Sequence, residues 1–200
     1  MPLYQPPNVH APTGGARGIA ETGADVALIY LSSIDAERTA AKIAAQTGVR
    51  VKAYHSDVSK RNIIAETISI VVANSEVCAN VPSLEYTEET RNNSVNYDGV
   101  MWTAQAAGKI FEKQGKGNRY GVTVEWAHFA RVNCISFGFI LTIMLTGQPK
   151  ELMAQWLAMI PGRRICDSAE SKGAYVFLAS DACCYMTGAH LVIDAGYNLP

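Results

Sequence analysis

The stretch Thr13-Gly14-Gly15-Ala16-Arg17-Gly18-Ile19 combines residue types that could bind an anion. A glycine-rich turn ahead of a helix presents backbone N–H groups to a negatively charged ligand, and the helix dipole adds to the attraction. Gly14 and Gly18 would let the backbone approach a pyrophosphate without a side chain in the way. Spaced glycines also occur in ordinary flexible loops, so this stretch alone leaves both interpretations open.

Short apolar runs alternate with helical patterns, and these elements would position the glycine-rich stretch. We expect strands over residues 26–30, 49–55, 68–73, 131–136 and 190–194. We expect helices over residues 35–46, 60–67, 98–113 and 150–159, and a last one that ends at Ala179 after the capping box Asp167-Ser168-Ala169-Glu170. This alternation predicts an α/β fold, a doubly wound, Rossmann-like parallel sheet with helices on both faces.

Composition limits the class of protein. The chain has 200 residues, of which 48% are hydrophobic, and a net charge of −1, which suits one domain over residues 1–200 and gives no reason to expect nucleic acid or a membrane as partner. Residues 1–12 hold four of the eight prolines and are predicted to form a disordered arm. The start shows no secretory signal, and five cysteines without a C-x-x-C spacing favour a cytoplasmic protein. The four histidines are scattered, so no metal site is expected.

Several short segments occur in an order that is typical of one enzyme family. They are Thr13-Gly14-Gly15-Ala16-Arg17-Gly18, Asp57-Val58, Ala73-Asn74-Ser75, Asn96 within Val95–Gly99, Ser136–Thr142 and Asp194-Ala195-Gly196. In this order they resemble the short-chain dehydrogenase/reductase family across nearly the whole chain. A narrower resemblance, carried by Ser75–Asn80 and residues 99–117, is to fungal NADP-dependent mannitol dehydrogenases and to sorbose or xylulose reductases.

The resemblance implies a dinucleotide site and one catalytic residue. The implied cofactor-binding residues are Thr13, Gly14, Arg17, Gly18, Ile19, Tyr30, Ser32, Ser33, Asp57, Val58, Asn74, Ser75, Gly138, Ile140 and Thr142. Asn96 would kink its helix and hold a water of the proton relay. The alternative for Asn96 is a polar residue that interrupts a helix and has structural duties only.

The cofactor is predicted from the residues at the end of the strand expected over residues 26–30. An enzyme that uses NAD places an acid there to hold the ribose 2′-OH, whereas Tyr30-Leu31-Ser32-Ser33 offers no carboxylate before Asp35. Hydroxyl groups can donate to a 2′-phosphate, and Arg17 could pair with it. We therefore expect NADP(H). Ser32 and Ser33 could also cap the next helix, and the two roles can coexist.

The sequence departs from the family where the chemistry should be. The family uses a tyrosine as general acid, a lysine four residues later and a serine, but none of the nine tyrosines is followed by lysine at that spacing. Only five residues separate Asn118 from Val124, where the family has the serine and most of a helix. Losses at several such places favour an incompletely recorded chain over a domain that evolved short, and a splice form or a pseudogene product remains open. An intact mass well above 21.6 kDa would identify an incompletely recorded chain.

Two functions from different classes follow. The resemblance implies NADPH-dependent reduction of a ketose or similar ketone to the polyol, and the reverse reaction. The missing serine, tyrosine and lysine favour instead a non-catalytic nucleotide-binding or interaction protein on the same fold. The resemblance also implies a homotetramer for an intact protein, and we expect a weaker dimer through residues 185–200 for this chain.

Overall fold

The computed structural model describes residues 13–31, 33, 35–59, 69–76, 94–114, 117–119 and 123–199. The predicted arm over residues 1–12, the predicted helix over residues 60–67 and Ser32 lie outside the described residues. Every strand pair among the described residues is parallel. The predicted α/β class with parallel strands is therefore confirmed, although the described strands form four short sheets and not one continuous one.

The N-terminal elements form a βαβ unit beside the first helix. They are α1 (Thr13–Glu21), β1 (Val26–Tyr30), α2 (Ala36–Thr47) and β2 (Val51–His55). Strand β1 coincides with its predicted range, and it pairs with β2 over all five residues. Helix α2 ends at Gly48, whose φ of 76° is a conformation that glycine adopts at little cost. Arg50 binds the carboxylate of Asp25 and thereby joins the starts of the two strands.

The central strands form a three-stranded sheet and a two-stranded sheet, which share one extended segment that is interrupted at Asn133. Strand β3 (Ile70–Val71) pairs with β4 (Gly117–Arg119), and β4 pairs with β5 (Ala130–Val132). After Asn133 the chain continues as β6 (Cys134–Phe137), which pairs with β9 (His190–Ile193). The predicted strand over residues 131–136 is therefore divided in two.

Asn133 causes this division. Its side chain is buried, and its amide accepts a hydrogen bond from the Ala189 backbone N–H at 3.0 Å and donates one to the Met186 carbonyl at 3.1 Å. A buried amide without such partners would be costly, so the loop before β9 is fixed to this point of the strand.

The remaining elements follow the sheet in chain order. They are the π-helical turn Ser94–Gly99, α3 (Val100–Gln114), α4 (Thr123–Trp126), β7 (Ile140–Leu141), α5 (Ile143–Thr146), α6 (Lys150–Met159), β8 (Cys166–Asp167), the 3-10 turn η3 (Ser168–Ser171), α7 (Lys172–Ala179) and the 3-10 turn η4 (Asp181–Cys183). The capping box expected at Asp167 and Glu170 is present. None of the described helices is long and apolar enough to cross a membrane.

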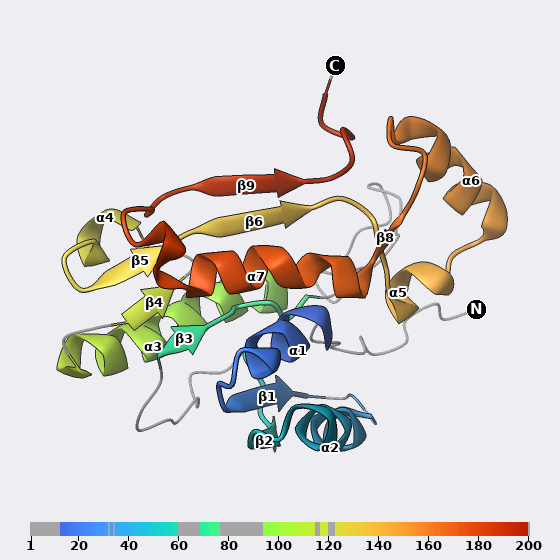
Figure 1. The fold of residues 1–200 in the computed structure, drawn as a ribbon. Coiled ribbons are helices and arrows are strands. Elements are labelled where there is room, and N and C mark those ends of the chain that lie inside the picture. The colour runs from blue at the N-terminus through green and yellow to red at the C-terminus, as the bar shows by residue number, and fades with distance from the viewer. Residues whose placement is uncertain are drawn as a thin grey trace.

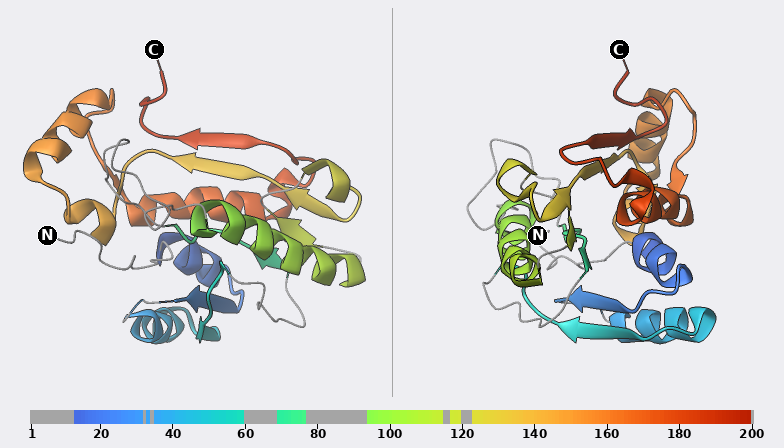
Figure 2. Two further views of the ribbon diagram at one scale, coloured as in Figure 1. Left: turned by 180° about the vertical axis from the view of Figure 1, so that it is seen from behind. Right: turned by 60° about the vertical axis from the view of Figure 1, so that its left-hand side comes forward.

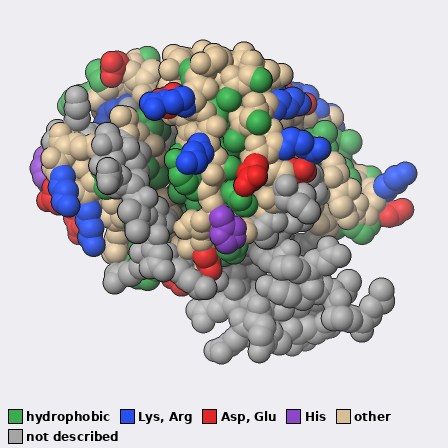
Figure 3. Space-filling view, turned by 90° about the horizontal axis from the view of Figure 1, so that it is seen from below, with side chains coloured by type: hydrophobic (Ala, Val, Ile, Leu, Met, Phe, Trp, Pro, Cys, Tyr) green, Lys and Arg blue, Asp and Glu red, His purple; other side chains and the backbone are tan. Residues whose placement is uncertain are grey.

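Helices lie on both faces of the strands, as the predicted doubly wound fold requires. In Figure 1, α1 and α7 lie side by side in front of the strands, and Figure 2 shows α3 on the opposite side. The core between these layers includes Phe111 and Val132, which are almost fully buried. On the face that carries α2 and β2, the described acidic and basic side chains are interspersed, so no large patch of one sign is seen there (Figure 3).

Arg131 joins β5 to the end of α7. Its guanidinium donates to the carbonyl oxygens of Leu178 and Ser180 at 3.0 and 3.1 Å, and it lies 3.0 Å from the Cys183 thiol. The last carbonyls of a helix have no partner within the helix and carry partial negative charge, so a cation there is favourable. This contact holds α7 in place along the sheet.

One face of β6 is not covered by any helix among the described residues. Phe137 packs against Tyr175 of α7, so Cys134 and Ser136, which alternate with it, point to the other side of the sheet. Seen from behind in Figure 2, α3 lies over β3 and β4, while β6 and β9 have no described helix in front of them. Cys134 and its cross-strand neighbour His190 are exposed.

Because this face is uncovered, Cys134 and Cys183 should differ in how fast they react with an alkylating reagent. In the folded protein, iodoacetamide should modify Cys134 rapidly, whereas Cys183, which is only 5% exposed, should react only after unfolding. Peptide mapping by mass spectrometry after a short exposure measures both rates, with exposed Cys184 as the positive control. Equal protection of Cys134 and Cys183 would mean that another segment covers this side of the sheet.

Candidate functional site

The carboxyl ends of the parallel strands meet the first turn of α1. In open α/β sheets, ligands bind at this edge. Asn74 follows β3, and its Oδ1 accepts a hydrogen bond from the Tyr175 hydroxyl at 3.1 Å. The ring of Tyr175 also closes over Gly15 of α1, where an added Cβ would lie 3.0 Å from the ring. The first turn of α1 and the end of β3 are therefore neighbours.

The structure corrects the interpretation of the glycine-rich stretch. It was expected to form a turn ahead of a helix, but Thr13 to Ile19 already belong to α1. A Cβ on Gly14 would lie 2.0 Å from the Ser168 carbonyl oxygen, and one on Gly18 would lie 3.0 Å from Lys172. Close packing of α1 against η3 and α7 thus explains both glycines without a ligand. The N–H groups of the first helical turn still have no acceptor within the helix and can serve an anion.

The structure also separates Arg17 from Ser33. The Arg17 guanidinium donates to Oε1 of Gln46 in the last turn of α2 and lies 4.0 Å from Glu21. Ser33 precedes α2, whose 12 residues span roughly 18 Å at 1.5 Å per residue. Arg17 and Ser33 therefore lie toward opposite ends of α2, and their joint action on a 2′-phosphate stays a prediction.

A carboxylate that sequence analysis missed lies at the end of β1. The Tyr30 hydroxyl donates to Oε1 of Glu37 at 3.3 Å, and the Tyr30 ring packs edge-on against His55. Burial, with a smaller effect of the Glu37 charge, raises the pKa of Tyr30. Glu37 is the second residue of α2 and lies in its first turn, close to the end of β1.

Asp57 and Val58 follow β2 at the same edge. The Asp57 carboxylate accepts hydrogen bonds from the backbone N–H of Ser59 at 3.0 Å and from its hydroxyl at 2.6 Å. These bonds hold the turn after the strand. Val58 is half-buried in this turn.

The segment from Gly138 to Thr142 is fixed by the C-terminal strands. The Gly138 N–H donates to the Ile193 carbonyl at 3.0 Å, and a Cβ on Gly138 would lie 2.9 Å from Asp194. Ile140 pairs with Cys166, and the Thr142 carbonyl accepts the first hydrogen bonds of α5. The segment therefore lies at the carboxyl end of β6, where a ligand of the sheet edge would pass.

Asn96 lies in the π-helical turn before α3, and its side chain is exposed. A π-helical turn widens the helix locally, and such turns often mark functional sites. Helix α3 covers the face of the strands opposite to α1 and α7 (Figure 2). A role of Asn96 in proton transfer stays a prediction.

The connection between β4 and β5 is short. These strands are parallel neighbours, and residues 120–129 join them with α4 as a single helical turn. Parallel strands ordinarily need a crossover of a dozen or more residues. Tyr120 lies outside the described residues, but the sequence places no lysine four positions after it.

Tyr175 is a second residue of this edge that sequence analysis missed. It is 5% exposed, and burial, with a smaller effect of the Glu76 charge, raises its pKa to about 12. Burial also raises the pKa of the Glu76 carboxyl, although part of that side chain is exposed. The sequence signal for Tyr175 was one of packing alone, because its partner Asn74 lies 101 positions earlier.

The shifted pKa of Tyr175 predicts a loss of stability at alkaline pH. The unfolded chain releases the phenol proton near pH 10 and the folded chain near pH 12, so stability falls as pH rises through this window. Two pKa units correspond to about 2–3 kcal/mol. Urea unfolding at pH 9 and 11.5 should show this loss in the wild type and less of it in Tyr175→Phe. Exposed Tyr185→Phe is the control, and an equal decline in both variants would contradict the prediction.

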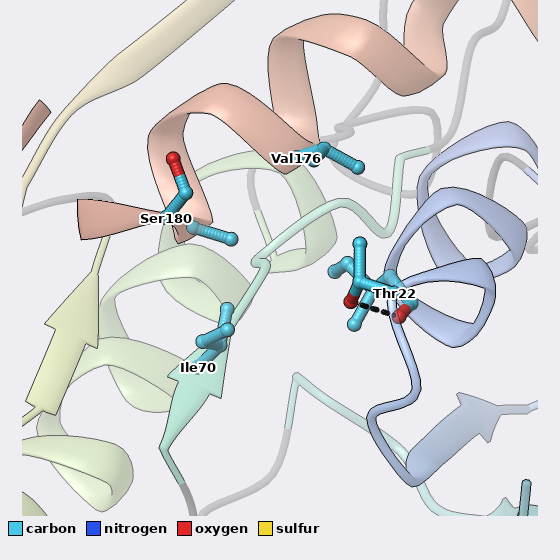
Figure 4. A pocket seen from close by; sticks show the side chains of 6 residues that line it. Thr22, Ile70, Val176 and Ser180 are labelled. Carbon is cyan, nitrogen blue, oxygen red and sulfur yellow. Dashed lines mark hydrogen bonds between the residues drawn. The ribbon is translucent and has the colours of Figure 1, made fainter. Parts of the chain in front are cut away.

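A cavity of about 120 Å³ lies between α1, β3 and α7 (Figure 4). Its lining is Ile19, Thr22, Ile70, Val176, Ala179 and Ser180. The hydroxyls of Thr22 and Ser180 donate to the carbonyls of Ile19 and Phe177, at 2.7 and 2.8 Å. Because no lining residue is titratable, this cavity has no group for acid–base chemistry.

Comparison with known proteins identifies the family. A family model described as enoyl-(acyl carrier protein) reductase matches residues 117–198. The sorbose reductase of Schizosaccharomyces pombe is 32% identical over 92% of this chain and 93% of its own length. The chain belongs to the short-chain dehydrogenase/reductase family. An NADP-dependent mannitol dehydrogenase of Hypocrea jecorina, another member, is 34% identical over 92% of this chain and 85% of its own.

Solved structures of the family agree with the fold. The NADPH-dependent 3-quinuclidinone reductase of Rhodotorula rubra is 29% identical with a TM-score of 0.77 and covers 94% of this chain and 86% of its own. A protein of Agrobacterium tumefaciens that is provisionally described as a 2-deoxy-d-gluconate 3-dehydrogenase, with bound NADP, is 25% identical with a TM-score of 0.81. The match covers 92% of this chain and 90% of that protein's chain.

The family match also shows that internal segments are missing. The match with the sorbose reductase spans 238 residues, which is more than the whole of this 200-residue chain. Relatives therefore have residues inside the matched region that have no counterpart here. The short crossover between β4 and β5 is one place where the structure is compatible with such a loss.

Proposed function

We propose that this protein is an NADP(H)-dependent oxidoreductase that reduces a ketose or a similar ketone to the polyol and catalyses the reverse reaction. The observation that carries the proposal is the match over nine-tenths of the chain to sorbose, mannitol and L-xylulose enzymes at 32–34% identity. The family membership supports a nicotinamide cofactor, and the relatives' names support a polyhydroxy substrate.

The described residues fit such a cofactor by their chemistry. The N–H groups of the first turn of α1 are the donors that a pyrophosphate needs, and Tyr175 contacts both this turn and Asn74 at the carboxyl edge of the sheet. Gly138 to Thr142 follow β6, whose last residue, Phe137, packs against Tyr175. When bound, the nicotinamide would supply or accept the hydride, and the protein's part is to hold and orient it.

NADP(H) is the proposed dinucleotide, and Glu37 makes the choice testable. The sequence Tyr30-Leu31-Ser32-Ser33 at the end of β1 supplies hydroxyl groups, which favour a 2′-phosphate. The carboxylate of Glu37, however, contacts the Tyr30 hydroxyl at the same strand end. A carboxylate favours a ribose hydroxyl and repels a phosphate. Fluorescence titrations with NADPH and NADH decide between them, and tighter binding of NADH would overturn the proposal. Glu37→Gln should strengthen NADPH binding relative to NADH.

A second function, dinucleotide binding without turnover, is favoured by the crossover between β4 and β5. The ten positions 120–129 contain no tyrosine–lysine pair, so this chain lacks the family's general acid. The two functions are separated by one pair of assays on the purified protein. NADPH binding together with ketose-dependent oxidation of NADPH supports the first, and NADPH binding without turnover across a panel of ketoses supports the second.

The assembly proposed for this chain is a dimer through its C-terminal surface. Among the described strands, β9 pairs only with β6, so its outer edge can accept a partner. Val192, Tyr185 and Leu199 near this edge are exposed apolar residues. Light scattering after size-exclusion chromatography should give a dimer at micromolar concentration that Val192→Lys weakens, and a monomeric wild type would contradict it. A tetramer is expected only for a protein that also has the missing helix.

A further inference from the structure

One side chain of α7 touches three segments that are far apart in the sequence. The Tyr175 hydroxyl donates to Oδ1 of Asn74 at 3.1 Å, and its ring would lie 3.0 Å from a Cβ on Gly15. Its ring centroid is also 5.7 Å from that of Phe137, the last residue of β6. Tyr175 therefore sets the relative position of the first turn of α1, the end of β3 and the end of β6.

The hydrogen bond also fixes the orientation of the Asn74 amide. An asparagine amide has an acceptor oxygen on one side and an NH₂ donor on the other. Because Oδ1 faces the Tyr175 hydroxyl, Nδ2 is held on the side away from it. Asn74 can then present a donor at the sheet edge beside the N–H groups of α1, where an oxygen-rich ligand would need both.

Tyr175 is suited to this task by its surroundings. The residue is buried, so the bond is shielded from competing water. The hydroxyl is protonated through the neutral range, as an ordinary phenol is, and burial raises its pKa further to about 12, so it remains a donor. A phenylalanine could fill the same space against Gly15 and Phe137 but could not orient the amide.

We propose that Tyr175 is a positioning residue for dinucleotide binding and that it acts through Asn74. This inference rests on the proposed function, namely that the chain binds NADP(H). The ring places α1 relative to the sheet, and the hydroxyl orients the donor face of Asn74 toward the ligand.

The test is a double-mutant cycle read by NADPH fluorescence. The dissociation constant is measured for the wild type, Tyr175→Phe, Asn74→Ala and the double variant, with exposed Tyr185→Phe as the matched control. Tyr175→Phe should weaken binding about fivefold, the value of one ordinary hydrogen bond. Asn74→Ala should weaken binding at least as much, and the double variant should bind no worse than Asn74→Ala alone. Tyr185→Phe should bind as the wild type does.

Each other outcome has a definite meaning. Equal binding by Tyr175→Phe and the wild type overturns this inference and leaves the proposed function standing. Losses that add in the double variant also overturn it, because Tyr175 would then act independently of Asn74. Failure of the wild type to bind NADPH overturns both. Thermal unfolding without NADPH shows whether each variant is folded. If the hydroxyl has a purely structural role, Tyr175→Phe will have a lower unfolding temperature, but the NADPH dissociation constants will show no coupling between Tyr175 and Asn74.

Discussion

Gly14→Ala will lower the free energy of unfolding by about 3 kcal/mol or more, even in the absence of any ligand. The added Cβ would lie 2.0 Å from the carbonyl oxygen of Ser168 and 2.5 Å from the hydroxyl oxygen of Ser171. The first of these is a backbone atom and cannot rotate away, so α1 must move off η3. Urea unfolding followed by circular dichroism measures the loss.

The matched control is Gly173→Ala in α7. A Cβ there would meet nothing within 4 Å, and alanine is a better helix former than glycine by about 1 kcal/mol. Gly173→Ala should therefore leave stability unchanged or raise it by up to that amount. If the two variants unfold at the same urea concentration, α1 does not pack against η3 as described.

Restoring the missing crossover should raise ketose reduction about 100- to 10,000-fold over that of the 200-residue chain. This is the usual contribution of a positioned general acid, and the chain lacks the family's tyrosine and lysine. The insertion is the serine and Tyr-x-x-x-Lys segment of an active family member, placed between β4 and α4, where the chain now crosses through residues 120–129. NADPH oxidation measured at 340 nm gives the rate.

The control for this graft is the same insertion with phenylalanine at its tyrosine. The control should fold and bind NADPH as the active graft does, but it should reduce ketose no faster than the original chain. Turnover by the original chain at the rate of the active graft would show that another residue supplies the proton. In that case the second proposed function would also be wrong.

The sequence predicted correctly those strands, helices and caps that depend on residues close together in the chain. Strand β1 coincides with the apolar run from Val26 to Tyr30, and α6 coincides with the predicted helix over residues 150–159. The capping box at Asp167 was predicted because both of its partners lie within four residues. Where non-local partners decide, the predictions were wrong. The strand over residues 131–136 breaks at Asn133 because the loop before β9 binds that amide.

The contacts around the candidate site were harder to predict than the strands and helices for the same reason. Arg17 was expected at a phosphate, but it contacts Gln46, a residue that only the packing of α1 beside α2 brings within reach. Glu37 reaches Tyr30 because the loop after β1 places the first turn of α2 beside the end of that strand, and Tyr175 reaches Asn74 across the sheet edge. None of these pairs has a local sequence signal, since each depends on how helices are set against strands.

The packing around Gly14 has a consequence for the evolution of such chains. Because η3 fills the space beside this glycine, natural selection for a folded protein is sufficient to retain it. A lineage that lost its general acid would keep the glycine-rich signature for as long as it kept α1 against η3. The glycine-rich signature in a genome sequence therefore indicates family membership and a chain that can fold. Enzymatic activity has to be inferred from the residues between β4 and β5 instead.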